Sequence, residues 1–304
     1  MSNELFVAGV AVSLGMLFYW GFRVLPQDKW QFLAAVPHKH LADGSWQAIN
    51  LTYYGLFNAL AHLIALSILL VLTGSIGITE DKVLIIMLVM MAACLPASRL
   101  LARWIEKKAH TFTVGGASFV GILLGPVMVW VVYRTLYPDA FIPWLPLLAA
   151  IAIAYAVGEG AGRLACISFG CCYGKPVETG QCYFNRLCRR YAFTFTGTTK
   201  KISYEGGLDG HQVFPIQAVT ATIFVGIALT GMYLFLIGAY GLAFLLTIFV
   251  TQLWRFFRRC SGLIIGGGVL CRLISSWHCW FCPTRCQSSS ACPRLPLLPI
   301  SGKG

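Results

Sequence analysis

Positions 162–174 combine an arginine, three cysteines and three glycines at the end of an apolar stretch, and they read GRLACISFGCCYG. Arg163 carries a fixed positive charge at a bilayer boundary, where a charged side chain is costly and most often serves to bind an anion such as a lipid phosphate. The alternative is that Arg163 only extends its guanidinium group to the headgroups, as arginines near helix ends commonly do. The cysteine- and glycine-rich context favours a site.

The three cysteines of this run, Cys166, Cys171 and Cys172, admit three interpretations. A thiol beside the arginine could be held as a thiolate and act as a nucleophile. The three could bind a metal ion together with Cys182, Cys188 or a histidine, although their spacing matches no common zinc pattern. They could also be small, buried packing residues, which free cysteine often is. The sequence leaves these interpretations open, and no metal site is predicted from it.

The elements that position these residues must lie in a membrane. The chain has 304 residues, of which 58% are hydrophobic and 11% charged, and its mean hydropathy is +0.73. Soluble domains carry about 25% charged residues, so the composition predicts an all-α polytopic integral membrane protein. Outer-membrane barrels are excluded because they show short alternating segments. The net charge of +12 is explained by basic loops that face anionic headgroups, and nucleic acid is excluded as a partner.

Seven apolar segments are long enough to cross a bilayer, which takes about 20 residues per helix. They lie at 5–22, 54–78, 83–101, 119–133, 142–157, 216–237 and 240–257. The fifth runs into the polar sequence GEG at 158–160. The basic and aromatic segment 175–213 is long enough for a small extramembrane subdomain with a strand or two, such as 192–196. The segment 23–51 is polar, and we expect Trp30 and Trp46 to lie at the membrane interface.

Four stretches of the chain occur in an order that is typical of one family. They read YYGL at 53–56, GGASFVGILLG at 115–125, the run at 162–174, and PIQ at 215–217 followed by WRF at 254–256. The chain resembles the prolipoprotein diacylglyceryl transferase family, whose signature GRxxNxxxGExxG aligns with 162–174 without gaps. The resemblance divides the chain into an N-terminal helix and polar segment at 1–52 and a transferase-like membrane core at 53–257, with an extramembrane insertion at about 175–213.

The resemblance implies an enzyme of the bacterial inner membrane that needs no cofactor. Such an enzyme moves the diacylglyceryl group of phosphatidylglycerol to the thiol of the lipobox cysteine in a prolipoprotein signal peptide, and glycerol phosphate leaves. The resemblance assigns Arg163 and Arg255 to the phosphate, because the arginine fork can bind two phosphate oxygens and stays charged. It further implies substrate-binding roles for Tyr54, Gly116, Ser118, Gly121, Gly170, Gly174 and Gln217.

Four positions depart from the family pattern. The chain has Val120 at the position of the histidine usually assigned as the base, Cys166 and Cys171 at those of the signature asparagine and glutamate, and Thr251 at that of a late tyrosine. Valine cannot accept a proton.

Two alternatives to the family activity therefore stay open. One is a related membrane transferase that uses another lipid or acceptor, with Cys171 or Cys172 taking part. The other is a non-catalytic lipid-binding or transport protein. His110 and His211 are substitutes for the missing base only by their proximity in the sequence.

The last part of the chain differs in composition from the rest. Six of the twelve cysteines lie beyond residue 258, and the family's late Arg-x-Asp-x-Arg-Gly element and last helix are missing. Codons for 259–268 can be chosen so that a shifted frame restores that element. We predict that 258–304 is an aberrant, unstructured tail produced by a frameshift and that its cysteines carry no function. A nucleotide sequence in which no single-base change opens that frame would contradict this.

Overall fold

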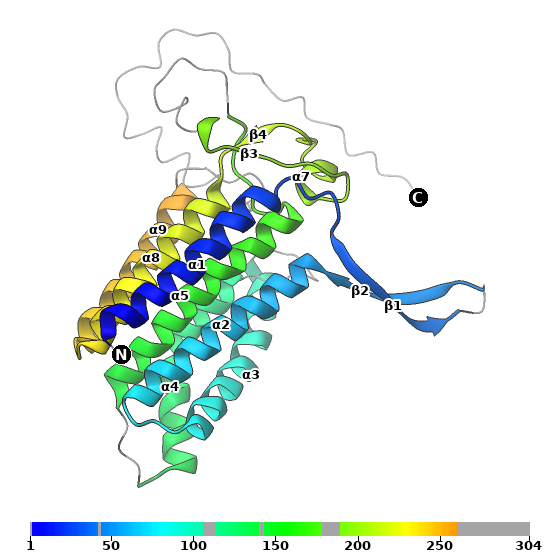
Figure 1. Ribbon diagram of the computed structural model, residues 1–304. Helices are drawn as coiled ribbons and strands as arrows, with labels where there is room; N and C mark the ends of the chain where they lie inside the picture. The colour runs from blue at the N-terminus through cyan, green and yellow to red at the C-terminus, as the bar shows by residue number, and fades with distance from the viewer. Residues whose placement is uncertain are drawn as a thin grey trace, which may run out of the picture.

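The chain forms a bundle of long helices with small β-structures at one end (Figure 1). The computed structural model describes residues 2–41, 44–105, 114–139, 141, 143–177 and 189–260. The long helices are α1 (Asn3–Val24), α2 (Tyr53–Ser75), α3 (Glu80–Ile105), α4 (Val114–Leu136), α5 (Trp144–Phe169), α8 (Ile216–Leu236) and α9 (Tyr240–Cys260). Within the described ranges, α1, α2, α5, α8 and α9 are long and apolar enough to cross a membrane. The predicted all-α polytopic membrane fold is confirmed.

The two other predicted spans, 83–101 and 119–133, lie in α3 and α4, which pack against each other. Each of these helices continues through an internal proline, Pro96 in α3 and Pro126 in α4. Proline is tolerated inside membrane helices because neighbouring helices and local adjustments satisfy the backbone groups that it frees. Each of the seven predicted segments lies mainly in a helix, and five of these helices are long and apolar enough, within the described residues, to cross a membrane.

Helix α5 lies at the centre of the bundle and packs against α1, α2, α8 and α9 (Figure 1). Glycines allow this close packing. A Cβ atom on Gly158 would lie 3.0 Å from the Cβ atom of Ala65 on α2, and one on Gly160 would lie 2.8 Å from Val225 Cγ2 on α8. Small residues let the backbones of membrane helices approach one another.

The course of α5 corrects one expectation from the sequence. The helix that contains the apolar segment 142–157 does not end at the GEG sequence. It continues to Phe169. Glycines at 158 and 160 lower helix propensity by about 1 kcal/mol each relative to alanine, but here they allow two helix contacts that require their small size. As a result, Glu159 and Arg163 lie inside the helix, and Arg163 is not at its end.

A left-handed glycine ends α5 and directs the chain into the segment predicted to form an extramembrane subdomain. Gly170 has a φ angle of 68°, and the N–H group of the next residue, Cys171, bonds to the carbonyl oxygen of Cys166 at 3.0 Å. This is the usual glycine stop of a helix. The described part of the subdomain contains β3 (Phe193–Thr194), α7 (Lys201–Tyr204) and β4 (Gln212–Val213), and β3 pairs with β4 in antiparallel fashion. The predicted strand within 192–196 is confirmed.

A buried lysine connects this subdomain to α1. The Lys200 side chain is fully buried, and its Nζ donates hydrogen bonds to the carbonyl oxygens of Leu25 at 2.6 Å and Pro26 at 2.9 Å. A cation at the carboxyl end of a helix satisfies carbonyl groups that have no partner within the helix. Burial lowers the pKa of Lys200 to about 8.

The polar segment after α1 forms a hairpin that the sequence did not predict. Strands β1 (Phe32–His40) and β2 (Trp46–Thr52) pair in antiparallel fashion and extend away from the bundle (Figure 1). Almost every residue of both strands is exposed. Since neither face of the hairpin is buried, its sequence does not show the apolar alternation by which strands are usually recognised.

Candidate functional site

A buried carboxylate, Glu159 on α5, brings together the polar side chains of the bundle. Its Oε1 atom accepts a hydrogen bond from Arg163, one helical turn further along, and its Oε2 atom accepts hydrogen bonds from Arg255 on α9 and from the hydroxyl of Tyr155. Arg255 also donates to the Tyr155 hydroxyl and lies over the rings of Tyr155 and Phe224, 5.6 and 5.9 Å from their centroids. The two arginines assigned to the phosphate are distant in the sequence and share one carboxylate in the fold.

Arg163 is enclosed by protein. Its side chain is 10% exposed and that of Glu159 is 5% exposed. Arg163 therefore does not lie along the surface toward headgroups, as the alternative of simple extension requires. Its Nε atom is buried and has no hydrogen-bond partner among the described residues. The described residues therefore leave the hydrogen-bonding capacity of this donor unused.

The site carries more positive than negative charge. Arg258, three residues after Arg255, is half-buried and interacts electrostatically with Glu159, Arg163 and Arg255. Three guanidinium groups minus one carboxylate leave a formal charge of +2. An excess of charge away from water is costly unless it is paired. The arrangement is suited to an anion.

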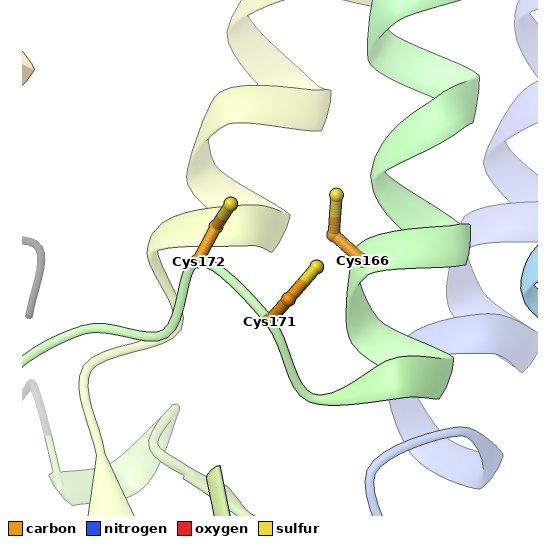
Figure 2. A group of neighbouring side chains, drawn as sticks. All are labelled: Cys166, Cys171 and Cys172. Carbon is orange, nitrogen blue, oxygen red and sulfur yellow. The ribbon is translucent and has the colours of Figure 1, made fainter. Parts of the chain in front are cut away.

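The three cysteines of the 162–174 run come together at the end of α5. Cys166 lies on the helix, Cys171 and Cys172 follow the glycine turn, and their sulfur atoms all lie within 4.8 Å of one another (Figure 2). Cys172 has a φ angle of 53°, which is uncommon for a residue other than glycine. The glycine turn and this backbone conformation bring the three thiols together.

The thiols of the two residues after the turn differ in acidity. Hydrogen bonds from the Cys166 and Cys171 thiols, together with the charges of Arg163 and Arg258, lower the pKa of Cys172 well below its usual range. Hydrogen bonds to the other two sulfurs, and burial, raise the pKa of Cys171. The thiolate form is therefore favoured at Cys172 over Cys171.

Two further predicted residues border the cysteine cluster. Gln217, in the first turn of α8, is 1% exposed, and its Nε2 atom donates to the carbonyl oxygen of Cys171 at 2.9 Å. Its Oε1 atom is buried without a hydrogen-bond partner in the described part of the chain. Tyr54, in the first turn of α2, packs edge-on against Phe169 with a centroid distance of 5.6 Å and interacts electrostatically with the cysteines. The fold thus brings Tyr54, Gln217 and the 162–174 run to one end of the bundle.

The predicted glycines of the run have backbone roles. A Cβ atom on Gly170 would lie 3.0 Å from Ile202 Cγ2, and one on Gly174 would lie 2.4 Å from the carbonyl oxygen of Phe214. Both glycines hold the turn against the extramembrane subdomain. Any contact that they make with a substrate remains a prediction.

The remaining predicted residues lie in or near α4. Gly121 faces α3, where its Cβ position is 3.7 Å from the sulfur of Cys94. Gly116 and Ser118 lie in the first turns of α4, and their side chains, like that of Val120, fall outside the described residues. Their assignment to substrate stays a prediction.

The two candidate bases and the tail are placed as follows. His211 is exposed in the extramembrane subdomain, with its Nδ1 atom 3.0 Å from the carbonyl oxygen of Asp209. His110 and residues 261–304 lie outside the described residues. The first three residues of the predicted tail, 258–260, are helical and continue α9, so the prediction that the chain is unstructured from 258 is wrong for these residues.

Comparison with known families gives one match. The family model of the prolipoprotein diacylglyceryl transferases matches residues 45–265. The chain belongs to this family. The match includes the residues around Glu159, the cysteine cluster and Tyr54, and it confirms the resemblance identified from the four motifs. The comparisons with curated proteins and with solved structures gave no match. The diacylglyceryl transferase family acts on lipid and prolipoprotein substrates.

Sequence reasoning did not assign a role to Glu159, Tyr155 or Arg258. The signal for Glu159 was present, because an acid inside an apolar run, four residues before an arginine, is the spacing of an ion pair on one helix face. Ionisable residues inside a membrane segment are functional candidates by default. Tyr155 and Arg258 carry no such signal, since their partners depend on how α5 and α9 pack.

Proposed function

We propose that this protein transfers the diacylglyceryl group of phosphatidylglycerol to the thiol of the lipobox cysteine in a prolipoprotein signal peptide, in the bacterial inner membrane. Membership of the family supports diacylglyceryl transfer onto a prolipoprotein. The observation that carries the finer assignment is the buried excess of positive charge around Glu159. Phosphatidylglycerol presents one anionic phosphate linked to the glyceryl group that must be transferred.

In this proposal Arg163 and Arg255 bind the lipid phosphate while Glu159 holds both guanidinium groups in place. The unpartnered Nε atom of Arg163 supplies a donor that the carboxylate does not use. Hydrogen bonds between a guanidinium group and a phosphate are roughly twice as strong as those between neutral groups. Tyr54 and Gln217 lie at the end of the bundle where the headgroup would enter.

The transfer itself replaces one bond at the glyceryl carbon by another. The acceptor thiol loses its proton, and the thiolate attacks the glyceryl carbon that bears the phosphate. A C–S bond forms, the C–O bond breaks, and the electron pair leaves with glycerol phosphate. The phosphate gains negative charge as it leaves, so the arginines bind the transition state more tightly than the lipid. Such differential binding lowers the barrier.

A transfer assay in membranes tests the proposal. It uses labelled phosphatidylglycerol and a lipobox-cysteine peptide, and it measures thioether-linked product. Arg163→Ala should lower the rate by about 10²–10³-fold, the effect of losing one donor to a developing anion. Arg134→Ala is the matched control, because Arg134 is exposed in the last turn of α4 and should leave the rate unchanged. A peptide with serine in place of cysteine should yield no thioether.

The outcomes separate the alternatives. Folded protein that binds lipid vesicles and yields no product would refute the proposal and favour the lipid-binding or transport protein. Product from another phospholipid, and none from phosphatidylglycerol, would favour the related transferase. Equal loss of activity in Arg163→Ala and Arg134→Ala would contradict the role given to Arg163.

A further inference from the structure

The cysteine cluster has a geometry that packing does not require. Cys166 and Cys171 are half-buried and Cys172 is exposed, so the three thiols do not fill a core. Cys172 keeps a left-handed backbone conformation, which costs of order 1–3 kcal/mol in a residue other than glycine and persists only where the surroundings impose it. The three side chains converge from the end of α5 and the turn after it (Figure 2).

We propose that Cys166, Cys171 and Cys172 bind one thiophilic metal ion of the zinc class and leave its fourth position open to the acceptor thiol. The first half of this inference stands on the cluster alone, and the second half rests on the proposed function. Neither the resemblance nor the family pattern includes such an ion, since the family has asparagine and glutamate at the positions of Cys166 and Cys171.

The distances fit a thiolate metal site. A tetrahedral zinc ion with Zn–S bonds of about 2.3 Å holds its sulfur ligands about 3.8 Å apart. The three sulfur atoms already lie within 4.8 Å of one another. Small side-chain rotations are enough to close that difference. Thiolate ligands select zinc-class and other soft ions over magnesium and calcium.

The described residues supply three ligands, which is the number that catalytic zinc sites use. In the described part of the chain, no histidine, aspartate, glutamate or further cysteine completes the group of three. Structural zinc ions have four protein ligands, whereas catalytic ones have three and keep one position for water or substrate. The unpartnered Oε1 atom of Gln217, whose amide is bonded to the backbone of Cys171, offers an acceptor for a metal-bound water.

The charges around the cluster are compatible with this ion. Three thiolates and one divalent ion carry a net charge of −1, and Arg163 and Arg258 interact electrostatically with Cys172. The positive excess of +2 at Glu159 more than compensates this charge while water holds the fourth position, and it balances the charge of −2 that the cluster carries once the acceptor thiolate binds.

A metal ion would explain how the thiol is activated in this chain. The position of the family base is occupied by Val120, which cannot take a proton. A thiol that coordinates a divalent ion is deprotonated by it. The acceptor thiol would displace the bound water and release its proton to solvent. The thiolate would then attack the glyceryl carbon, the C–S bond would form as the C–O bond breaks, and the thioether product would leave as water returns.

Cobalt(II) is the probe for the site, because cobalt thiolate sites absorb light by charge transfer from sulfur to metal. The full chain is titrated with Co²⁺ in a background in which all cysteines beyond residue 258 are serine. Cys182→Ser and Cys188→Ser should leave the absorption unchanged, and a changed spectrum in either variant would overturn the open position. We expect one ion per chain, and we expect the absorption to be lost in Cys166→Ser, Cys171→Ser and Cys172→Ser. Cys94→Ser is the matched control, since Cys94 lies on α3 and should leave the spectrum unchanged. Zn²⁺ should displace the cobalt.

The acceptor is tested in the same spectrum. A lipobox-cysteine peptide should change the charge-transfer band and the serine peptide should not. Absence of bound cobalt, or a band that survives substitution of the cluster, would overturn the metal site. A charge-transfer band that does not change when the cysteine peptide is added would overturn the open fourth position on the metal ion.

Transfer activity separates this inference from the proposed function. Full transfer by chelated, metal-free protein would refute the role of the ion and leave the proposed function intact. Cobalt bound by the three cysteines, in protein that makes no thioether from any phospholipid, would support the metal site and refute the proposed function.

Discussion

Glu159→Gln should destabilise the bundle strongly, because one substitution removes the counter-ion of two arginines. The side chain of Glu159 is 5% exposed, and those of Arg163 and Arg255 are 10% and 12% exposed. Removing one partner of a buried ion pair costs about 3–5 kcal/mol, since the other charge stays buried. Glutamine has nearly the same shape and can still accept from Tyr155, so the loss comes mainly from charge.

This cost predicts a measurable change in thermal stability. One kcal/mol lowers the Tm of a domain of 150–250 residues by roughly 2–4 °C, so Glu159→Gln should lower it by roughly 6–20 °C. The assay is thermal unfolding of the purified protein in detergent, followed by tryptophan fluorescence. Glu80→Gln is the control, because Glu80 lies exposed in the first turn of α3. Surface substitutions of this kind change stability by no more than about 0.5 kcal/mol.

A double substitution distinguishes charge from packing. Glu159→Gln combined with Arg255→Met removes one of the two cations that the Glu159 carboxylate binds, so the double variant should be more stable than Glu159→Gln alone. Such a coupling is expected for residues in direct contact. A Tm for Glu159→Gln within 2 °C of the parent protein, or a double variant that is less stable than either single one, would refute the assignment of Glu159 as the shared counter-ion.

Three further predictions concern the end of the bundle where the glycine turn at Gly170 follows α5. The pKa of Lys200 is about 8 in the folded protein, whereas the ordinary value for a lysine is 10.5. Its buried charge therefore destabilises the fold below pH 8. This cost, at most about 3 kcal/mol, falls as pH rises from 8 to 10.5, so Tm should rise over that window, and Lys200→Met should flatten that part of the profile. Gly174→Ala should lower Tm and transfer activity together, since its Cβ atom would clash with the Phe214 carbonyl, and unchanged values in both would contradict this. In metal-free protein, alkylation of Cys172 should vary little with pH around neutrality, because its pKa is lowered, and Cys172→Ser should lose this labelling. A rate that rises tenfold per pH unit, as for an ordinary thiol, would contradict this.

The helices could be predicted from the sequence because each must satisfy its own backbone groups in lipid, and a bilayer-length apolar run has few other options. The end of α5 could not be predicted in the same way. Glycine is compatible with a turn and with close helix packing, and the choice at Gly158 and Gly160 depends on Ala65 and Val225, which lie on other helices. The β1–β2 hairpin was not predicted from the sequence, because both of its faces are exposed and its strands show no alternation of apolar and polar residues.

The site was predictable in part for a similar reason. Arg163 and Arg255 were found through family motifs, but their common partner Glu159 depends on the contact between α5 and α9. The cysteine cluster depends on the left-handed turn at Gly170. Had the helix continued, residues 166 and 171 would project from different faces, and the spacing alone gives no reason to expect the three sulfurs to meet.

The placement of Glu159 and Arg163 one turn apart on the same helix also bears on how the protein is inserted into its membrane. A lone charged side chain at the centre of an inserting helix costs about 2.5–3.5 kcal/mol. Because α5 carries its own counter-ion, the pair can form within this helix before α9 has been synthesised. Arg255 joins the carboxylate only when α9 arrives, so the surplus positive charge arises after other helices already shield α5. Replacing Arg163 should therefore impair membrane integration of a nascent chain that ends before α9, well before any enzyme could act.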